Sequence, residues 1–98
     1  MELVLTSRFV KNDNEEHAKV SVTRIPVSST ISKETLYQSI RTIQKGFLAL
    51  QATKGIRESL IDDSIESIAE TDFGFVSCRI RYENGDIERC DFHTHINK

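Results

Sequence analysis

The sequence predicts an α+β fold, a four-stranded antiparallel sheet of two hairpins with one or two helices packed on one face, in the order ββ-α(α)-ββ. Three observations predict it: alternating apolar residues near the amino terminus, a helical apolar stripe in the middle, and a tight-turn signal near the carboxyl terminus. The 98 residues are enough for one domain, residues 1–98, with a core of modest size.

The first hairpin is predicted by two alternating segments, residues 2–10 and 17–27, joined by the polar residues 11–16. Pro26 has no amide hydrogen to donate to a neighbouring strand, so it ends the second segment or places it at an edge of the sheet. The first segment is apolar on both of its faces, since Val4 and Val10 alternate with leucine and phenylalanine. A sheet with two apolar faces in so short a chain favours a homo-oligomer, in which another subunit covers the second face.

A helix is expected over residues 33 to about 53, after N-cap candidates in residues 28–32. Its apolar stripe follows steps of four and three and consists of Leu36, Ile40, Ile43, Phe47 and Leu50. Gly55 is a plausible end of this helix. A helical spacing continues through residues 57–71 at Ile61, Ile65 and Ile68, so we expect a second helix with an acidic outer face.

The second hairpin is predicted by its turn, Glu83-Asn84-Gly85, which suits a three-residue loop with glycine in the left-handed region. That register pairs Cys78 with Cys90, whereas a two-residue loop would shift every pair by one residue. We prefer the first register because it gathers one apolar face, which consists of Val76, Cys78, Ile80, Cys90, Phe92 and Ile96. The opposite face then carries Phe75, Ser77, Arg79, Arg81, Arg89, Asp91, His93 and His95.

Composition narrows the classes of function. No apolar run approaches the roughly 20 residues of a membrane helix, and no signal peptide is recognisable, so we expect a soluble cytoplasmic protein without a membrane partner. The net charge of -2 argues against a nucleic-acid partner.

The two cysteines are expected to be reduced and buried, as small apolar side chains of a cytoplasmic protein. Cys90 and His93 have the spacing of some zinc ligands, but residues three apart on a strand point to opposite faces. His93 and His95 point the same way, and Asp91 extends their row, which leaves a transition-metal site as one alternative. The facing residues Phe75 and Ser77 are poor ligands, so we predict no metal, no cofactor and a solvated polar strand.

The arginines on the second face form the candidate ligand site. Arg79 and Arg89 face each other in the preferred register, and like charges so placed are unfavourable unless an anion or a carboxylate lies between them. Guanidinium groups bind phosphate or carboxylate with paired donors, and an aromatic ring can stack on a base. The predicted ligand-binding residues are Phe75, Arg79, Arg81, Arg89, His93 and His95. The alternative is that Asp91, Glu88 or the acidic helix neutralises these arginines.

Two other groups of residues are weaker candidates for a binding or catalytic site. Tyr37, Arg41, Gln44 and Lys45 lie on the expected outer side of the first helix and could add to a pocket or an interface. The acids Asp62, Asp63 and Glu66 lack a recognisable pocket, and no phosphate loop, nucleophile elbow or zinc-protease motif is present in the sequence.

Two functional hypotheses follow. The first is a non-catalytic interaction protein, an inhibitor or regulator that binds a protein partner stoichiometrically as a homo-oligomer, through its helix face, its acidic segment or a sheet edge. The second is a binder of a small anionic ligand such as a nucleotide through the arginine face, with hydrolysis by a histidine as a remote extension. The absence of catalytic motifs in the sequence favours the first, and we predict no catalytic residues.

Overall fold

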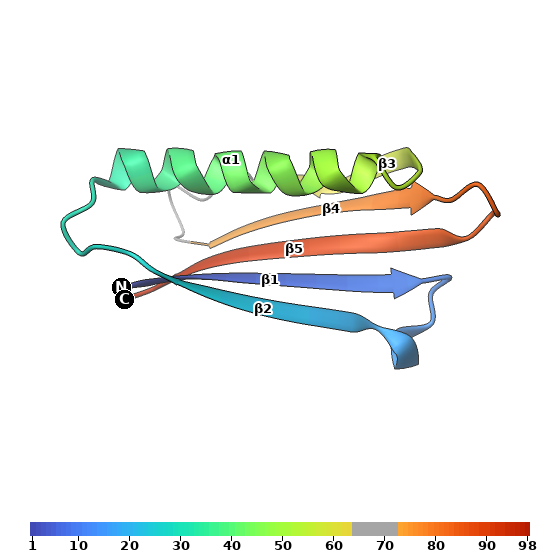
Figure 1. Cartoon of the computed structure of the whole chain (residues 1–98), viewed down its shortest axis with the longest axis horizontal. Coiled ribbons are helices and arrows are strands. Elements are labelled where there is room, and N and C mark those ends of the chain that lie inside the picture. The colour runs from blue at the N-terminus through green and yellow to red at the C-terminus, as the bar shows by residue number, and fades with distance from the viewer. Residues whose placement is uncertain (64–72) are drawn as a thin grey trace.

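A computed structural model describes residues 1–63 and 73–98 of the chain. Its elements are β1 (Glu2–Lys11), the 3-10 turn η1 (Glu15–His17), β2 (Lys19–Pro26), α1 (Lys33–Ala52), β3 (Ile56–Asp63), β4 (Phe73–Arg81) and β5 (Ile87–Asn97). The strands form one antiparallel sheet of order β2-β1-β5-β4-β3, and α1 packs on one of its faces (Figure 1). The α+β class is therefore confirmed, but the described sheet has five strands instead of four.

The expected second helix over residues 57–71 is wrong where the structure describes it. Residues 56–63 form β3, which pairs with β4 as an edge strand, and the rest of that segment lies outside the described residues. Two register shifts, between Arg57 and Ser59 and between Leu60 and Asp62, interrupt the pairing. Such irregularities break the period-two alternation that identifies a strand, so the isoleucine spacing suggested a helix instead.

Helix α1 begins and ends close to the predicted positions. Ser32 is its N-cap, and the Ser32 hydroxyl accepts a hydrogen bond from the amide of Thr35 at 3.1 Å. Most of the expected stripe faces the sheet, but Leu50 is 66% exposed, and Leu48 and Gln51 are buried instead. A stripe with steps of four and three drifts around a helix of 3.6 residues per turn, which moves Leu50 off the sheet after two heptads.

The β4–β5 hairpin has the predicted register, with Cys78 opposite Cys90 and Val76 opposite Phe92. Gly85 adopts a φ of +93°, and the amide of Tyr82 donates to the carbonyl of Asp86 at 2.8 Å, as a three-residue loop requires. The apolar face assigned from the sequence is buried throughout: Val76, Cys78, Ile80, Cys90, Phe92 and Ile96 lie in the core.

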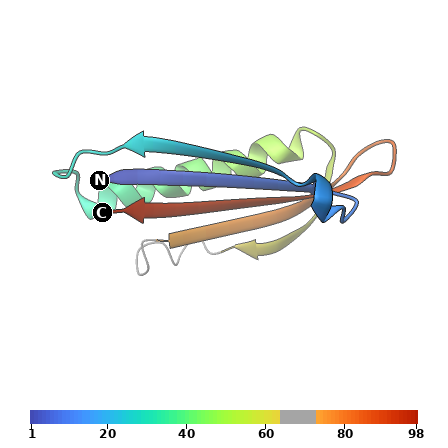
Figure 2. The same cartoon turned by 90° about the horizontal axis from the view of Figure 1, so that it is seen from below.

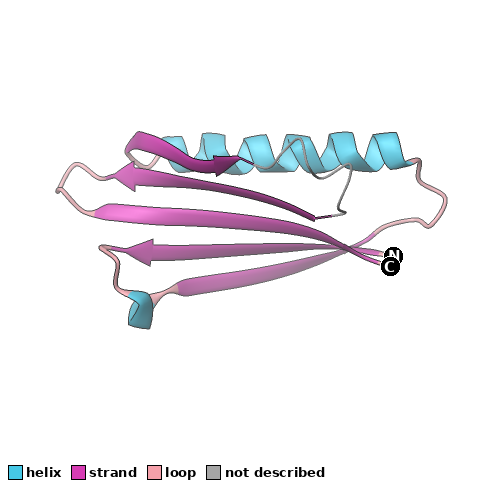
Figure 3. Cartoon of the chain, turned by 180° about the vertical axis from the view of Figure 1, so that it is seen from behind, coloured by secondary structure: helices cyan, strands magenta, loops and turns pink. Residues whose placement is uncertain are grey.

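Strand β5 is the central strand of the sheet and joins the two hairpins. It pairs with β1 on one side and with β4 on the other, and the two termini of the chain lie side by side (Figures 1 and 3). The core beneath α1 includes the stacked rings of Phe47 and Phe92, whose centroids are 4.5 Å apart. Apart from η1 at the end of β1, no element covers the sheet face opposite α1 among the described residues (Figure 2); we call it the open face.

Candidate functional site

The open face is ordered in rows that cross the sheet, because paired residues point to the same side. Two rows near the hairpin turns are polar, and they consist of Val10, Arg89 and Arg79, and of Val20, Arg8, Asp91 and Ser77. Two rows near the chain termini are apolar and aromatic, and they consist of Val22, Thr6, His93 and Phe75, and of Arg24, Val4, His95 and Phe73. The six residues predicted as one ligand site are therefore spread over both halves of this face.

Arg79 and Arg89 are cross-strand neighbours, as predicted, and they line a pocket of about 280 Å³ with Val10, Asn12, Asp13 and Ile87. Val10 is buried at this place, whereas both guanidinium groups remain partly exposed. The buried Nε of Arg79 has no hydrogen-bond acceptor among the described residues. The pocket thus presents two cations to one small space.

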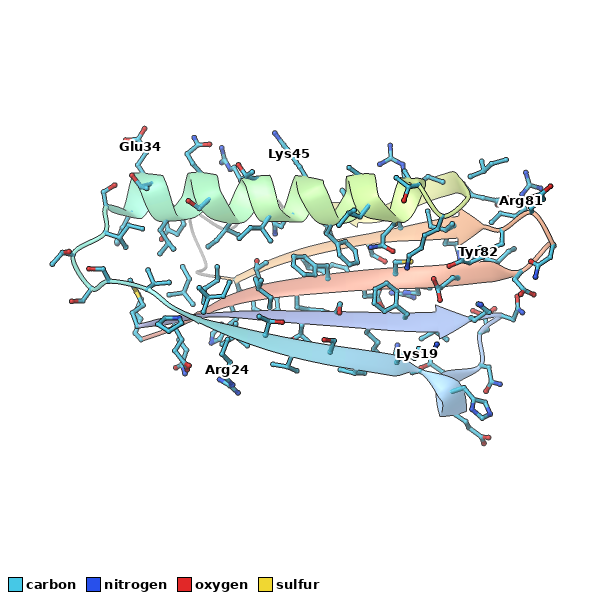
Figure 4. The ribbon with its side chains drawn as sticks, in the orientation of Figure 1. Lys19, Arg24, Glu34, Lys45, Arg81 and Tyr82 are labelled. Carbon is cyan, nitrogen blue, oxygen red and sulfur yellow. The ribbon has the colours of Figure 1, made fainter. Side chains whose placement is uncertain are left out.

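Carboxylates balance these cations. Arg89 Nε donates to Asp91 Oδ1 at 3.0 Å, and Arg79 lies 3.7 Å from the carboxylate of Asp13. Arg81 lies at the end of β4, next to the turn into β5 (Figure 4), and its Nε lies 2.8 Å from Glu58 Oε1. Each of the three predicted arginines therefore has an acidic neighbour. Asp91 was among the acids expected to neutralise them, whereas Glu88 lies on the helix side of the sheet and Asp13 was not expected.

Asp91 is buried although it lies on the open face. Ser77 donates a hydrogen bond to its carboxylate at 2.5 Å, and Arg8 is its cross-strand neighbour on β1. A buried carboxylate needs such partners, because an unpaired one is costly away from water. Asp91 therefore anchors the polar half of the face.

The aromatic half brings His93 and His95 against two phenylalanines. The ring of His93 lies 4.6 Å from that of Phe75 and 5.7 Å from that of Phe73, and His95 lies 6.1 Å from Phe73. These centroid separations are those of packed aromatic pairs. Phe75 thus lies beside the histidines and two rows away from Arg79 and Arg89.

His93 and His95 lie in neighbouring rows of the open face, with Asp91 in the next row, but the other candidate ligands lie elsewhere. His93 lies on the open face while Cys90 lies in the core, as their spacing predicted, and His17 lies in η1. Within residues 1–63 and 73–98, no group of three or more His, Cys, Asp or Glu side chains is placed to hold a metal ion.

Cys78 and Cys90 are both buried free thiols on the helix side of the sheet. Their mutual hydrogen bond, with burial, raises the pKa of Cys90, and the same hydrogen bond lowers the pKa of Cys78. Both side chains are fully buried beside Val76, Ile80 and Phe92, where they pack as small apolar residues.

Asn12 and Asp13 line the arginine pocket, but the sequence pattern did not identify them as part of it. Both have positive φ values, 52° and 58°, which asparagine and aspartate tolerate better than other residues with side chains. Asn12 ties this turn to the other hairpin, since its Oδ1 accepts from the amide of Ile87 at 3.0 Å and its Nδ2 donates to Asp86 at 3.0 Å. Hydrogen bonds from Asn12 and Asn84 lower the pKa of Asp86. The adjacent Asn-Asp pair was the available signal for such a turn.

The expected outer side of α1 needs one correction. Gln44 is fully buried, and its Nε2 donates to Thr94 Oγ1 at 3.3 Å, because the position lies over the central strand. Lys45 is exposed and points away from the sheet (Figure 4).

Comparison of the chain with models of protein families, with curated proteins and with solved structures gave no match. In the described part of the chain, no helix combines the length and the apolarity that crossing a membrane requires.

Proposed function

We propose that the protein is a non-catalytic interaction protein of the inhibitor or regulator type, which binds a protein partner stoichiometrically through its open face and works as a homo-oligomer. The observation that carries the proposal is the one-sided cover of the sheet. Helix α1 lies on one face, while Val20, Val22 and Phe73 are exposed on the other. Exposed apolar side chains gathered on one face are typical of a surface that binds another protein.

The charges of the open face support a protein partner over a small anion. The arginines of this face lie beside carboxylates of the same chain, so a free anion would compete with Asp13 and Asp91 for them. A protein surface can instead match a pattern of alternating charges and apolar side chains, which gives specificity. The histidines contact phenylalanine rings, an arrangement suited to packing against a partner.

Native mass spectrometry of the protein, isolated gently and without chelators, tests the proposal when compared with the denatured mass. We expect an assembly that contains a second protein in a fixed ratio. His95→Glu replaces an exposed imidazole on the central strand by a carboxylate, and this variant should no longer bind the second protein. Lys45→Glu, on the outer side of α1, is the control and should still bind it. Retention by the His95 variant, or an assembly that contains only this chain and a nucleotide, would contradict the proposal.

A second candidate function is the binding of a small anion between Arg79 and Arg89. The specific observation in its favour is their shared pocket of about 280 Å³. Asp13 is exposed and could be displaced from Arg79 by a phosphate, because exposed ion pairs contribute little stability. Calorimetry with inorganic phosphate and with ATP tests it. The double variant Arg79→Glu and Arg89→Glu should lose binding, while Arg24→Glu, on the same face, should keep it; binding that survives the double change excludes this site.

A further inference from the structure

Strand β2 forms a regular, unpaired edge of the sheet. Its pairing with β1 runs without a shift from Lys19 opposite Phe9 to Pro26 opposite Glu2, and no described strand pairs with its outer side. Unpaired amides and carbonyls along an edge can pair with a strand of another chain. The opposite edge, β3, differs because two register shifts interrupt it, and such irregularities discourage pairing. The regular edge is therefore the better docking strand.

The side chains of β2 are exposed on both faces of the sheet. Val20 is 60% and Val22 is 54% exposed on the open face, and Ile25 is exposed on the other face, because α1 does not extend over β2 (Figure 1). Valine, isoleucine and threonine are also the residues that favour strands. An added strand would thus bury apolar side chains of β2 and would also form hydrogen bonds with its unpaired amides and carbonyls.

The distribution of charge on β2 favours a second copy of the same chain. Lys19 and Arg24 are the charged residues of β2 and lie toward its opposite ends, with uncharged residues between them (Figure 4). Parallel pairing in register would set Lys19 opposite Lys19 and Arg24 opposite Arg24. In antiparallel pairing Lys19 and Arg24 cannot be direct partners, because they point to opposite faces of the sheet and paired residues point to the same face. The 3-10 turn η1 lies just before Lys19 in the chain and carries Glu15 and Glu16. Antiparallel pairing brings Arg24 toward that acidic turn of the second copy.

The symmetry limits the register. Two identical antiparallel strands are related by a two-fold axis perpendicular to the sheet, and paired side chains must point to the same face. A residue at the axis therefore pairs with itself. With Ser21 at the axis, Val20 pairs with Val22 of the partner subunit, and Arg24 lies toward Glu16 of the partner subunit.

We propose that β2 pairs antiparallel with β2 of a second copy, centred on Ser21, so that the described sheets of the two copies form one continuous sheet. This inference rests on the homo-oligomer part of the proposed function and names its interface. The two-fold axis places both α1 helices on the same side of the sheet, and it joins the two open faces into one continuous surface. The exposed valines of both copies then lie together at its centre.

Light scattering and native mass spectrometry of the full chain test the interface. We expect a dimer of the 11.2 kDa chain that becomes monomeric in the double variant Val20→Lys and Val22→Lys, because four added cations would meet at the axis. Ile56→Lys is the matched control: Ile56 is 63% exposed on β3, and this variant should remain a dimer. Circular dichroism verifies that each variant is folded.

Cysteine cross-linking provides a second readout that does not depend on disruption. Ser21→Cys should form an intermolecular disulfide under mild oxidation, since the two positions face each other at the axis. Thr23→Cys should not, because the two copies of that position lie several residues apart along the strands. The native cysteines are buried, and the wild-type chain controls for them.

The outcomes separate this inference from the proposed function. A monomer overturns both the interface and the homo-oligomer, while partner binding by the open face is measured independently with the His95 variant. A dimer that survives the lysine substitutions overturns the β2 interface but leaves the homo-oligomer standing. Cross-linking through Thr23→Cys in place of Ser21→Cys overturns the register.

Discussion

At the scale of single residues, a close backbone contact explains why position 55 is a glycine. Gly55 follows α1 where the chain turns into β3, and a Cβ added there would lie 2.4 Å from the carbonyl oxygen of Arg81. The residue was predicted as a helix end, and the structure adds a different reason for glycine, the close approach of β4.

Gly55→Ala should therefore destabilise the protein, by about 1–3 kcal/mol, because the neighbouring backbone must move. Gly46 is the matched control: it lies exposed within α1, and an added Cβ meets nothing within 4 Å. Gly46→Ala should stabilise by about 0.5–1 kcal/mol, since alanine is the better helix former. Urea unfolding measures both, and equal effects of the two substitutions would refute this account of Gly55.

Tyr82 links the second hairpin to a buried acid. Its hydroxyl donates to Glu88 Oε1 at 2.6 Å, and Lys54 lies 3.8 Å from the same oxygen. Burial first, and then the hydrogen bond to Glu88, raise the pKa of Tyr82 well above its usual value near 10. The folded state therefore holds the tyrosine proton more tightly than the unfolded state does.

This difference predicts a dependence of stability on pH. The stabilisation by Tyr82 should be complete below about pH 10, where the unfolded tyrosine is protonated, and should fall as the pH rises above it. Tyr82→Phe should lower the free energy of unfolding by about 1.5 kcal/mol at pH 7, which is the typical contribution of a hydrogen bond to a charged group. Urea unfolding of both proteins between pH 7 and 11 measures the difference, which should shrink at alkaline pH. A constant difference across this range would rule out the linkage.

At the scale of elements, the position of α1 decides which of its leucines stabilise the fold. Leu36 is 5% exposed and packs with Leu3, Ile40 and Ile96, while Leu50 is 66% exposed. The same residue type therefore occupies a core position in the second turn and a surface position near the end of the helix.

Leu36→Ala should cost about 2–5 kcal/mol, as expected for a leucine removed from a core, and Leu50→Ala should change stability by no more than about 0.5 kcal/mol. The two variants carry the same chemical change, so their comparison isolates burial. Denaturant unfolding measures both free energies. A large loss in the Leu50 variant would mean that α1 is rotated relative to the sheet described above.

At the scale of the whole molecule, β5 holds the fold together because it is the central strand. It pairs with β1 from Glu2 opposite Asn97 to Lys11 opposite Glu88, and with β4 along its other side. Ile96, near the carboxyl terminus, is buried in the core. The last strand of the chain thus lies at the middle of the described sheet, with two strands on either side of it.

Amide hydrogen exchange should therefore find the β5 amides among the slowest in the protein, opening only with global unfolding. Leu36→Ala lowers the global stability, so it should accelerate exchange of these amides by a factor that matches its loss of free energy. Exchange of residues 93–96 ahead of β1 and β4 would show instead that the terminal strand frays by itself.

Features of the fold that depend on local chemistry follow from the sequence alone. The Glu83-Asn84-Gly85 turn set the register of the second hairpin, Pro26 ended β2, and Ser32 began α1. The same register assigned the cysteines to the core and the predicted ligand-binding residues Phe75, Arg79, Arg81, Arg89, His93 and His95 to the other face. These features were predictable because turn geometry, proline and helix capping act over a few residues.

How distant segments meet depends on the packing of the whole chain and could not be predicted from local patterns. Residues 56–63 became a strand because β4 offers them an edge, although their isoleucine spacing also fits a helix. Arg79 and Arg81 acquired their carboxylates from distant segments, Asp13 in the turn after β1 and Glu58 in β3. Asp91, two residues from Arg89 on the same strand, was the one acidic partner visible in the sequence. Ion pairs, sheet order and the free edge of β2 depend on which strands lie side by side, and no local propensity encodes that arrangement.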